Sequence, residues 1–478
     1  MLTPGDLELR PTGAERNPWL REALAIDPGI PAPPLDGGLA ADVAIVGGGY
    51  TGLWTAYQLL ERDPKLRIVI LEQDICGGGP SGRNGGFVNA WWDELAELVD
   101  LWGPAAALAA ARAVAESVEA IGTWCADNGV DAHYRRAGML LVSTSSLQDG
   151  AWRHAVEAAA HLDEATRYRE LTPREVADRC ASPVFRGGAL MPDGATVQPA
   201  LLARGLRRVC MERGVTIHEG TRVRAVRGRG LPSLRVLTGD GEVRARHVVL
   251  AVNAWGAGWP GIRGRVLTWS SYMVRTEPIP ERLAELRWTG GESIVDARFS
   301  VHYLRTTRDG RIAFGAGGGA PGFGGRIGGS FTADLGAARR AAIGFRRFFP
   351  QLSDVRLTDA WGGPIDVSPD HLPHIGTLAG GRIRYAVGYS GNGVAPAHLL
   401  GKVLAALIVG TDEPLTRLPM VRTARRFPPE PFRYVGARVL REALIRREDG
   451  EELGHRPPIW LRELTRLPRR LGYRLGPR

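Results

Sequence analysis

Short apolar runs and helical spacing alternate along the first part of the chain. Residues 42–46 and 67–71 are short apolar runs, and residues 50–62 between them place apolar side chains at helical spacing. This order predicts two buried parallel strands joined by a helix. Ahead of them, residues 1–40 predict an irregular leader that contains one short helix at 18–26.

The middle of the chain continues with both patterns. Helical spacing occurs at residues 105–128, 151–165 and 199–213, and apolar runs that predict strands occur at 138–143, 215–218 and 246–251. Further along, residues 383–387 predict another buried strand and residues 397–408 a helix.

Residues 271–314 follow a different pattern, in which strand-like stretches are broken by turns. The expected strands are 272–275, 300–304 and 311–314, and the pair Asp309-Gly310 is typical of a hairpin turn. This segment therefore predicts an antiparallel sheet inserted into the α/β part of the chain.

Glycines mark the turn after the first predicted strand. The segment Gly47-Gly48-Gly49-Tyr50-Thr51-Gly52 has the spacing G-x-G-x-x-G and opens the predicted helix. In this motif the glycines allow a tight turn, a close approach of the backbone to a pyrophosphate, and helix–strand packing. The second strand ends at Glu72, where an acidic side chain binds ribose hydroxyls. We expect a Rossmann-type dinucleotide site.

A second glycine-rich loop, Ser81-Gly82-Arg83-Asn84-Gly85-Gly86, follows soon after Glu72. Such a loop favours close approach of the backbone to a long planar cofactor, and Arg83 is placed to hold a phosphate or the edge of a ring. The fingerprint alone does not separate NAD from FAD.

Four segments together resemble a known family. They are residues 34–53, residues 81–86, Trp361 to Gly376, and Gly388-Tyr-Ser-Gly-Asn-Gly393 with the helix that follows. In order and spacing they resemble the D-amino-acid oxidase/glycine oxidase family of FAD-dependent oxidoreductases, and most of all its γ-glutamylputrescine oxidase branch. The resemblance covers most of residues 34–410.

The resemblance implies that the cofactor is FAD. Some members attach the flavin through a cysteine in the loop that is 315–319 here, which has none, so we expect non-covalent FAD. The helix after 388–393 would direct its positive end at the ring. The residues expected at FAD are Gly47, Gly49, Tyr50, Thr51, Gly52, Glu72, Ser81, Gly82, Arg83, Asn84, Gly85, Gly86, Val223, Asn253, Ala254, Gly388, Ser390, Gly391, Asn392 and Gly393.

The expected architecture is an α/β (α+β composite) fold, in which a Rossmann-type FAD-binding domain carries an inserted antiparallel-sheet substrate domain. We expect an N-terminal leader at 1–40, a discontinuous FAD-binding domain at 41–136, 186–262 and 355–412, a substrate domain at 137–185 and 263–354, and a basic C-terminal extension at 413–478.

Members of this family oxidise a C–N bond of an amine or amino acid by hydride transfer to flavin N5, and the resulting imine hydrolyses. The residues expected to form the substrate pocket between ring and sheet are Tyr272, His302, Tyr303, Arg305 and Trp361. His302 and Tyr303 point to opposite faces of a regular strand, so only one of them can face the flavin.

Lysine usage bears on the substrate and on the electron acceptor. Sarcosine-oxidase-like members grip the substrate carboxylate with a lysine where this chain has Ala395, which favours an amine or an amino acid whose acid group lies elsewhere. The two lysines of the chain, Lys65 and Lys402, lie outside the predicted sheet. Either O2 or another acceptor could therefore reoxidise the flavin.

Two other functions stay open at this point. A flavin monooxygenase shares the opening fingerprint, although its usual Gly-Asp loop is replaced here by the segment 388–391. The chain could also be an FAD-binding protein without amine oxidase activity, or one whose arginine-rich tail binds nucleic acid.

The formal net charge of +10 is concentrated at the C-terminus, where residues 421–478 hold 15 Arg against 7 Asp and Glu. Such a segment can bind nucleic acid or an anionic membrane surface, but a solvated extension is the expected reading. Within it, residues 458–467 predict an amphipathic helix ended by Pro468, which we expect to dock on the protein itself or on a second subunit.

The remaining composition favours a cytoplasmic protein without a metal site. Four scattered cysteines, Cys76, Cys125, Cys180 and Cys210, form no C-x-x-C pair. The chain shows no signal peptide and no apolar stretch long enough to span a bilayer.

Overall fold

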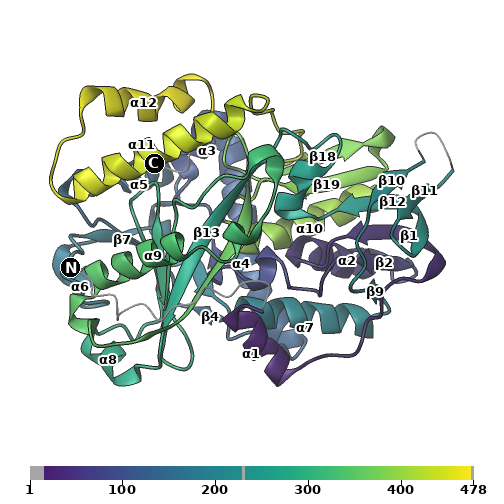
Figure 1. Cartoon of the computed structure of the whole chain (residues 1–478), viewed down its shortest axis with the longest axis horizontal. Coiled ribbons are helices and arrows are strands. Elements are labelled where there is room, and N and C mark those ends of the chain that lie inside the picture. Colours follow the sequence, from purple (N-terminus) through teal and green to yellow (C-terminus); the bar gives the residue numbers. More distant parts are fainter. Residues whose placement is uncertain (1–15, 229–231, 475–478) are drawn as a thin grey trace.

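The structure, a computed structural model, describes residues 16–228 and 232–474. Two large sheets lie side by side (Figure 1). In the first sheet, β1 (Gly37–Val46) pairs in parallel with β2 (Ile68–Leu71) on one side and β12 (Gly241–Leu250) on the other. The other strands of this sheet are β9 (Thr216–His218), β10 (Ala225–Arg227), β11 (Leu234–Leu237), β18 (His374–Leu378) and β19 (Ile383–Val387).

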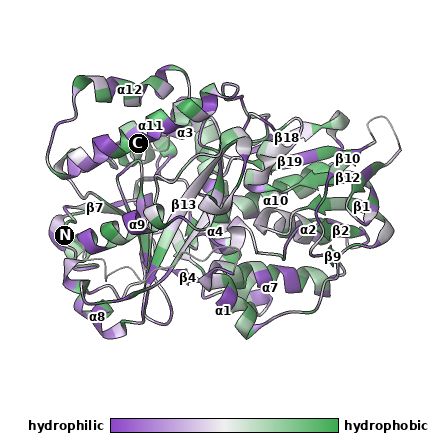
Figure 2. Ribbon diagram, in the orientation of Figure 1, coloured by the Kyte–Doolittle hydropathy of each residue, from purple (hydrophilic) through white to green (hydrophobic). Residues whose placement is uncertain are grey.

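Helices cover this sheet because their sequences are apolar on the sides that meet it. α2 (Tyr50–Arg62) starts directly after β1 and packs against α10 (Val394–Val409). A Cβ on Gly401 would lie 2.6 Å from Cβ of Trp54, so glycine lets the two helices approach closely. Figure 2 shows that β1, β2, β12 and α10 are largely hydrophobic. The other helices of this part are α1 (Pro18–Ile26), α3 (Leu95–Trp102), α4 (Pro104–Asp127) and α7 (Pro199–Glu212).

The second sheet has the order β17-β13-β16-β15-β14-β5-β7-β6 and is antiparallel except where β14 pairs with β5. Its strands are β5 (Met139–Val142), β6 (Arg169–Leu171), β7 (Gly188–Met191), β13 (Leu267–Thr276), β14 (Ser293–Asp296), β15 (His302–Thr306), β16 (Ile312–Ala316) and β17 (Leu357–Val367). The hairpin expected at Asp309-Gly310 joins β15 to β16, with Gly310 at φ +77°. α9 (Leu335–Phe348) packs Phe345 and Phe348 on Phe314 of this sheet.

The remaining elements are short. They are β3 (Phe87–Asn89), β4 (Arg135–Arg136), β8 (Gly194–Thr196), α5 (Arg153–His161), α6 (Pro173–Ala177), α8 (Pro280–Glu285) and the 3-10 helices η2 (Pro80–Gly82) and η5 (Asn253–Gly258). β3, β8 and β4 form a small third sheet. The α/β composite with an antiparallel sheet is therefore confirmed.

Two strands belong to a different sheet from the one that the expected domain boundaries predicted. β7 lies within 186–262 and β17 within 355–412, both expected in the FAD-binding domain, yet both belong to the second sheet. The cause is long-range pairing: β17 runs antiparallel to β13 along nearly its whole length, and β7 pairs with β5. The division of the chain into two functional domains stays a prediction.

In its described part the C-terminal extension folds into two helices that dock on the body, while most of its residues are exposed or half-buried. α11 (Phe432–Glu452) and α12 (Ile459–Arg470) lie across the second sheet (yellow in Figure 1). Arginines that suggested solvation are engaged with the body; Arg441, for example, donates to the carbonyls of Gly318 and Gly319. α12 also continues through Pro468, the expected end, because a proline in the last turn removes only one helical hydrogen bond.

Candidate active site

The turn after β1 accepts only glycine at two positions. Gly47 has φ +110°, and a Cβ there would lie 2.3 Å from the carbonyl oxygen of Ala251. A Cβ on Gly52 would lie 2.0 Å from the carbonyl oxygen of Gly47. Gly49 is the N-cap of α2 and offers no side-chain cap; the N–H of Tyr50 donates to Ser81, and the N–H groups that follow it in the first turn can bind an anion.

Glu72 ends β2 beside this turn. Its carboxylate accepts hydrogen bonds from the backbone N–H groups of Gly48, at 2.7 Å, and Asp74, at 2.9 Å. Burial raises the pKa of Glu72 to about 7, and the two backbone donors oppose that shift. The side chain is thus held in place at the expected position of the ribose.

The second glycine-rich loop, residues 81–86, is fixed between the two sheets. Ser81 Oγ accepts from the N–H of Tyr50 at 2.9 Å, which joins the loop to the start of α2. Arg83 Nε donates to the carbonyl of Gly78 at 3.0 Å, and Trp361 Nε1 on β17 donates to the carbonyl of Arg83 at 2.9 Å. The Arg83 guanidinium therefore already has a backbone partner, while it still faces the cavity described below.

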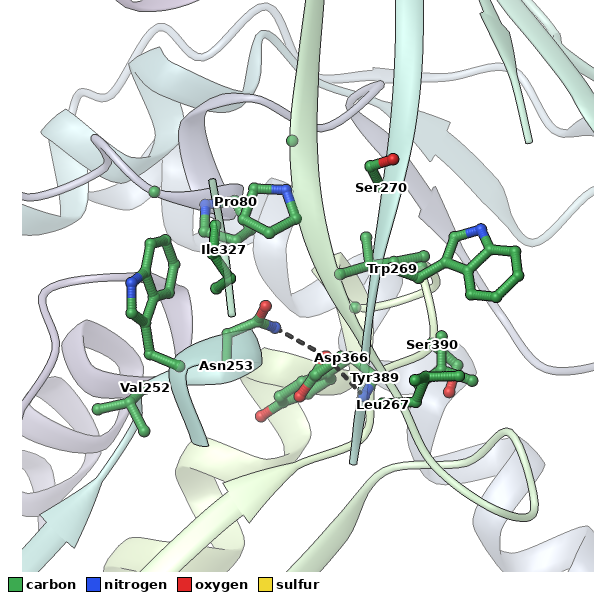
Figure 3. A pocket seen from close by; sticks show the side chains of 18 of the residues that line it. Pro80, Val252, Asn253, Leu267, Trp269, Ser270, Ile327, Asp366, Tyr389 and Ser390 are labelled. Atoms are coloured by element: carbon green, nitrogen blue, oxygen red, sulfur yellow. Dashed lines mark hydrogen bonds between the residues drawn. The ribbon is translucent and has the colours of Figure 1, made fainter. Parts of the chain in front are cut away.

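A buried carboxylate joins the loop at 388–393 to η5. Asp366, fully buried on β17, accepts from Asn253 Nδ2 at 2.9 Å and from the N–H groups of Gly388 at 2.5 Å and Tyr389 at 3.2 Å (Figure 3). Burial raises its pKa to about 7. The hydroxyl of Tyr389 also meets Thr51 Oγ1 at 2.7 Å, so segments far apart in sequence close around one space. Asn253 was among the residues expected at FAD, whereas Asp366 and Tyr389 lay within the segments that carry the resemblance but were given no role of their own.

That space is one continuous cavity of about 2330 Å³. The expected cofactor residues that line it are Gly47, Gly49, Tyr50, Thr51, Glu72, Ser81, Arg83, Asn84, Gly85, Val223, Asn253, Ser390, Gly391, Asn392 and Gly393. Five others lie behind its surface: Gly52, Gly82, Gly86, Ala254 and Gly388. The glycines among these five serve close packing, since a Cβ on each would meet another part of the chain at 2.7 Å or less.

The cavity suits FAD for a reason that the structure itself supplies. Gly49 and Gly393 are the N-caps of α2 and α10, neither carries a side-chain cap, and both line the cavity. Two positive helix ends therefore face the same space, where a pyrophosphate and the reduced ring of a flavin carry negative charge. The glycine turn at Gly47 adds the close backbone approach that a dinucleotide needs.

Two of the five expected substrate residues line this cavity, Tyr303 and Trp361. The Tyr303 hydroxyl shares a hydrogen bond of 2.8 Å with Ser271 Oγ, and its ring packs edge-on against Phe87 at 5.7 Å between centroids. Burial raises the pKa of Tyr303 to about 12, so its hydroxyl keeps its proton.

The structure places the other three residues elsewhere. His302 faces away from Tyr303, as strand alternation requires, and its Nδ1 bonds Asp296 Oδ2 at 2.7 Å against Phe348. Tyr272 points to the same far side and donates its hydroxyl hydrogen to the carbonyl of Ser330. Arg305 shares the face of Tyr303 but lies behind the loop 81–86, with its guanidinium 5.2 Å from the ring centre of Trp19.

The lining also includes residues that the sequence reasoning missed. Ser271, Met273 and Val301 line the cavity, and the alternation along β13 and β15 could have identified them beside Tyr303. Leu440 and Leu444 of α11 line it too. No local pattern signals that contribution, because it depends on how the extension folds back.

The cysteines of the chain lie outside the lining of the cavity. All four of them are free and buried. Across 16–228 and 232–474, no group of three or more His, Cys, Asp or Glu is placed to hold a metal ion. Within the same ranges, no helix has both the length and the apolar character needed to cross a bilayer.

Known proteins that are similar to this chain in sequence include two oxidoreductases. The gamma-glutamylputrescine oxidoreductase of Escherichia coli is 29% identical over 388 residues, which cover 79% of this chain and 86% of that protein. The probable oxidoreductase OrdL of Haemophilus influenzae is 28% identical over 392 residues, which cover 80% and 86%.

Solved structures share the fold. Glycine oxidase from Geobacillus kaustophilus superposes with a TM-score of 0.66 at 21% identity, over 82% of this chain and 100% of that one. L-Proline dehydrogenase from P. horikoshii gives a TM-score of 0.66 at 20% identity, over 81% and 96%. A family model described as FAD dependent oxidoreductase matches residues 42–407. Because this match spans most of the chain, the protein belongs to the D-amino-acid oxidase family of FAD-dependent oxidoreductases.

Proposed function

We propose that the protein oxidises a C–N bond of a small amine or amino acid, with FAD bound non-covalently. One observation carries the proposal: a single cavity joins the glycine turn of β1, the loop at 388–393, and the Tyr303 face of the second sheet. Relatives named for glycine, proline and gamma-glutamylputrescine, all of them amines, support this reaction type.

The chain's own groups would hold FAD along this cavity. The first turn of α2 and the glycines before it bind the pyrophosphate, and Glu72 binds the ribose. The start of α10 favours negative charge on the ring, and Asp366 keeps the loop 388–393 in position for it. When bound, FAD supplies a two-electron acceptor for the hydride that leaves the carbon next to nitrogen. No cysteine lines the cavity, which supports non-covalent attachment.

The substrate side orients the amine and keeps it neutral. The Tyr303 and Ser271 hydroxyls can each accept a hydrogen bond from an amine N–H, which positions the adjacent carbon. Met273 and Val301 add apolar surface, and such surroundings lower the pKa of an amine so that its lone pair is free. Loss of hydride from the neutral amine leaves an iminium ion, which reacts with water to give a carbonyl compound and a protonated amine or ammonium.

The proposal includes a cytoplasmic location, which four reduced, buried cysteines support. Neither Lys65 nor Lys402 lines the cavity, so we do not assign either of them a role in reaction with oxygen. O2 or another electron acceptor completes the cycle.

Anaerobic bleaching of the flavin absorption band tests the reaction. The panel contains γ-glutamyl-diamines, polyamines, N-methyl amino acids, glycine, proline and aminophosphonates. We expect one class to bleach the band, and readmitting air then separates an oxidase from a dehydrogenase. A yellow protein that no amine reduces, but that NADPH reduces, would point to a flavin monooxygenase instead. A protein that no candidate reduces would be an FAD-binding protein without this activity.

A further inference from the structure

The cavity is larger than a flavin site alone requires. Ligand pockets usually measure about 300–1,000 Å³, and this cavity measures about 2330 Å³. The additional wall comes from the C-terminal extension, which lies beyond the end of the family match at residue 407. Glycine oxidase is matched over its whole length by 82% of this chain, so the core fold does not need this wall.

The side of the extension that faces the cavity is apolar. α11 contributes Phe432, Leu440 and Leu444 at helical spacing. α12 and its C-cap contribute Leu464, Leu467 and Leu471 in the same way. Phe432 is 71% exposed, Leu467 45% and Leu471 59%. Apolar side chains left open at the mouth of a cavity are suited to cover by an apolar ligand.

This wall is held rigidly against the active site. At its start, Glu430 accepts from the N–H of Gly324 at 2.9 Å; further along α11, Arg441 donates to Gly318 and Gly319. Near its end, Glu448 accepts from the N–H of Ser300 at 3.1 Å. Ser300 precedes β15, which carries Tyr303, and Gly318 follows β16, which pairs with β15, so α11 is attached to the substrate side.

The arginines at this wall do not make it polar, because they are engaged in holding it. Arg433 pairs with Glu430 at 2.7 Å and is itself buried. Arg474 donates to the carbonyl of Glu97 at 2.9 Å, and its N–H donates to the carbonyl of Pro369. Pro369 is two residues from His371, which lines the cavity, so the segment that follows α12 is attached next to the cavity wall.

We propose that α11 and α12 form an apolar subsite beside the flavin site, which binds the alkyl or aryl chain of the substrate amine. This inference rests on the proposed function, because it takes the substrate of the protein to be an amine. It adds the substrate class, which is an amine whose nitrogen lies by Tyr303 and whose apolar part lies against the six side chains named above.

Binding of amines that cannot react tests the subsite separately from catalysis. α,α-Dimethylalkylamines have no hydrogen on the carbon next to nitrogen, so no hydride can leave. Titration calorimetry of the FAD-loaded protein with members of four, six and eight chain carbons should show Kd falling about fourfold for each added methylene. A Kd that does not change with chain length would overturn the proposal.

A matched pair of variants locates the effect. Leu467→Ser with Leu471→Ser should weaken binding of the eight-carbon amine at least about tenfold and flatten the dependence on chain length. Ile459→Ser, on the same helix but 71% exposed and outside the cavity, should change neither. Equal effects of both changes would contradict the subsite.

Two further outcomes keep this inference apart from the proposed function. Chain-length dependence without flavin bleaching by the matching primary alkylamines would support the subsite and contradict amine oxidation. Bleaching by a short polar amine, together with a Kd that does not change with chain length, would support amine oxidation and contradict the subsite. If the leucines instead pack on a second copy of the chain, sedimentation would show a dimer that the double variant dissociates, again with a flat series, and the proposal would fail.

Discussion

Tyr303, which is half-buried, and Tyr272, which is buried, lie in the same sheet but face opposite sides of it. Tyr303 reaches the cavity and Ser271, whereas Tyr272 reaches Ser330 on the far side. We expect Tyr303→Phe to slow flavin reduction by the substrate about two- to tenfold, the value of one hydrogen bond. Anaerobic stopped-flow spectroscopy measures this rate. Tyr272→Phe removes the same atom away from the cavity and should leave the rate unchanged; an equal loss in both variants would contradict the assignment of Tyr303.

The protonation of Asp366 makes the stability of the folded protein depend on pH. Burial raises its pKa to about 7, whereas an aspartate in an unfolded chain titrates near about 3.9. The folded protein therefore holds the proton more tightly than the unfolded chain. It follows that the stability contributed by Asp366 is complete below about pH 4 and is lost as the pH rises through about 7.

The variant Asp366→Asn tests this sign, because it does not titrate. The difference in Tm between the native protein and the variant should decrease from about pH 5 to about pH 8 and stay level above that. Scanning fluorimetry across this range measures it. If the native protein instead gains on the variant as pH rises, the donors Gly388, Tyr389 and Asn253 keep the carboxylate ionised and the sign is reversed.

At the scale of elements, α11 is held by a buried ionic cluster. Arg298, almost fully buried, pairs with Asp449 at 3.0 Å and with Glu448 and Glu452. Removing one partner of a buried pair costs about 3–5 kcal/mol, because a charge is left uncompensated. Arg298→Met should therefore lower Tm by several degrees and make α11 sensitive to protease.

The same helix offers a control for that change. Arg446 pairs with Glu442 at 3.2 Å, but both side chains are largely exposed. Such a pair contributes about 0–1 kcal/mol, so Arg446→Met should leave Tm and the proteolysis pattern nearly unchanged. A comparable loss in the two variants would mean that the buried cluster does not anchor the helix.

Local sequence patterns predicted the helices and strands better than they predicted which strands pair with one another. α2 and α10 were expected close to where they lie because apolar spacing and glycine turns are local signals. Membership of β7 and β17 in the second sheet depends on pairing with β5 and β13, which no short stretch encodes.

In the candidate active site, too, local patterns identified some residues and missed those that depend on long-range contacts. Residues of the glycine loops were identified because their spacing carries the chemistry. His302 was a weaker candidate, since alternation alone does not say which face meets the cofactor. α11 showed neither signal: its arginines resemble a solvated surface until the partners Gly318 and Gly319 are known.

At the scale of the whole molecule, the cavity collects residues from both large sheets and from the extension. A ligand that fills it contacts segments that lie far apart in the sequence, among them the loop of Arg83, which Trp361 holds, and the loop of Tyr389, which Thr51 holds. FAD should therefore stabilise the whole chain as well as serve the chemistry, because a ligand that binds only the folded state shifts unfolding.

Removal of the cofactor makes this measurable. The apoprotein should melt at a lower temperature, and each tenfold rise in free FAD above its Kd should add about 1.4 kcal/mol to the free energy of unfolding. Calorimetry at increasing FAD concentrations measures the trend. Gly38→Ala, where an added Cβ meets nothing within 4 Å, should keep this response. Gly52→Ala, whose Cβ would lie 2.0 Å from the carbonyl oxygen of Gly47, should lose it, because the turn that holds the pyrophosphate cannot close. A Tm that ignores FAD in the native protein would mean that the cavity does not hold the dinucleotide in this way.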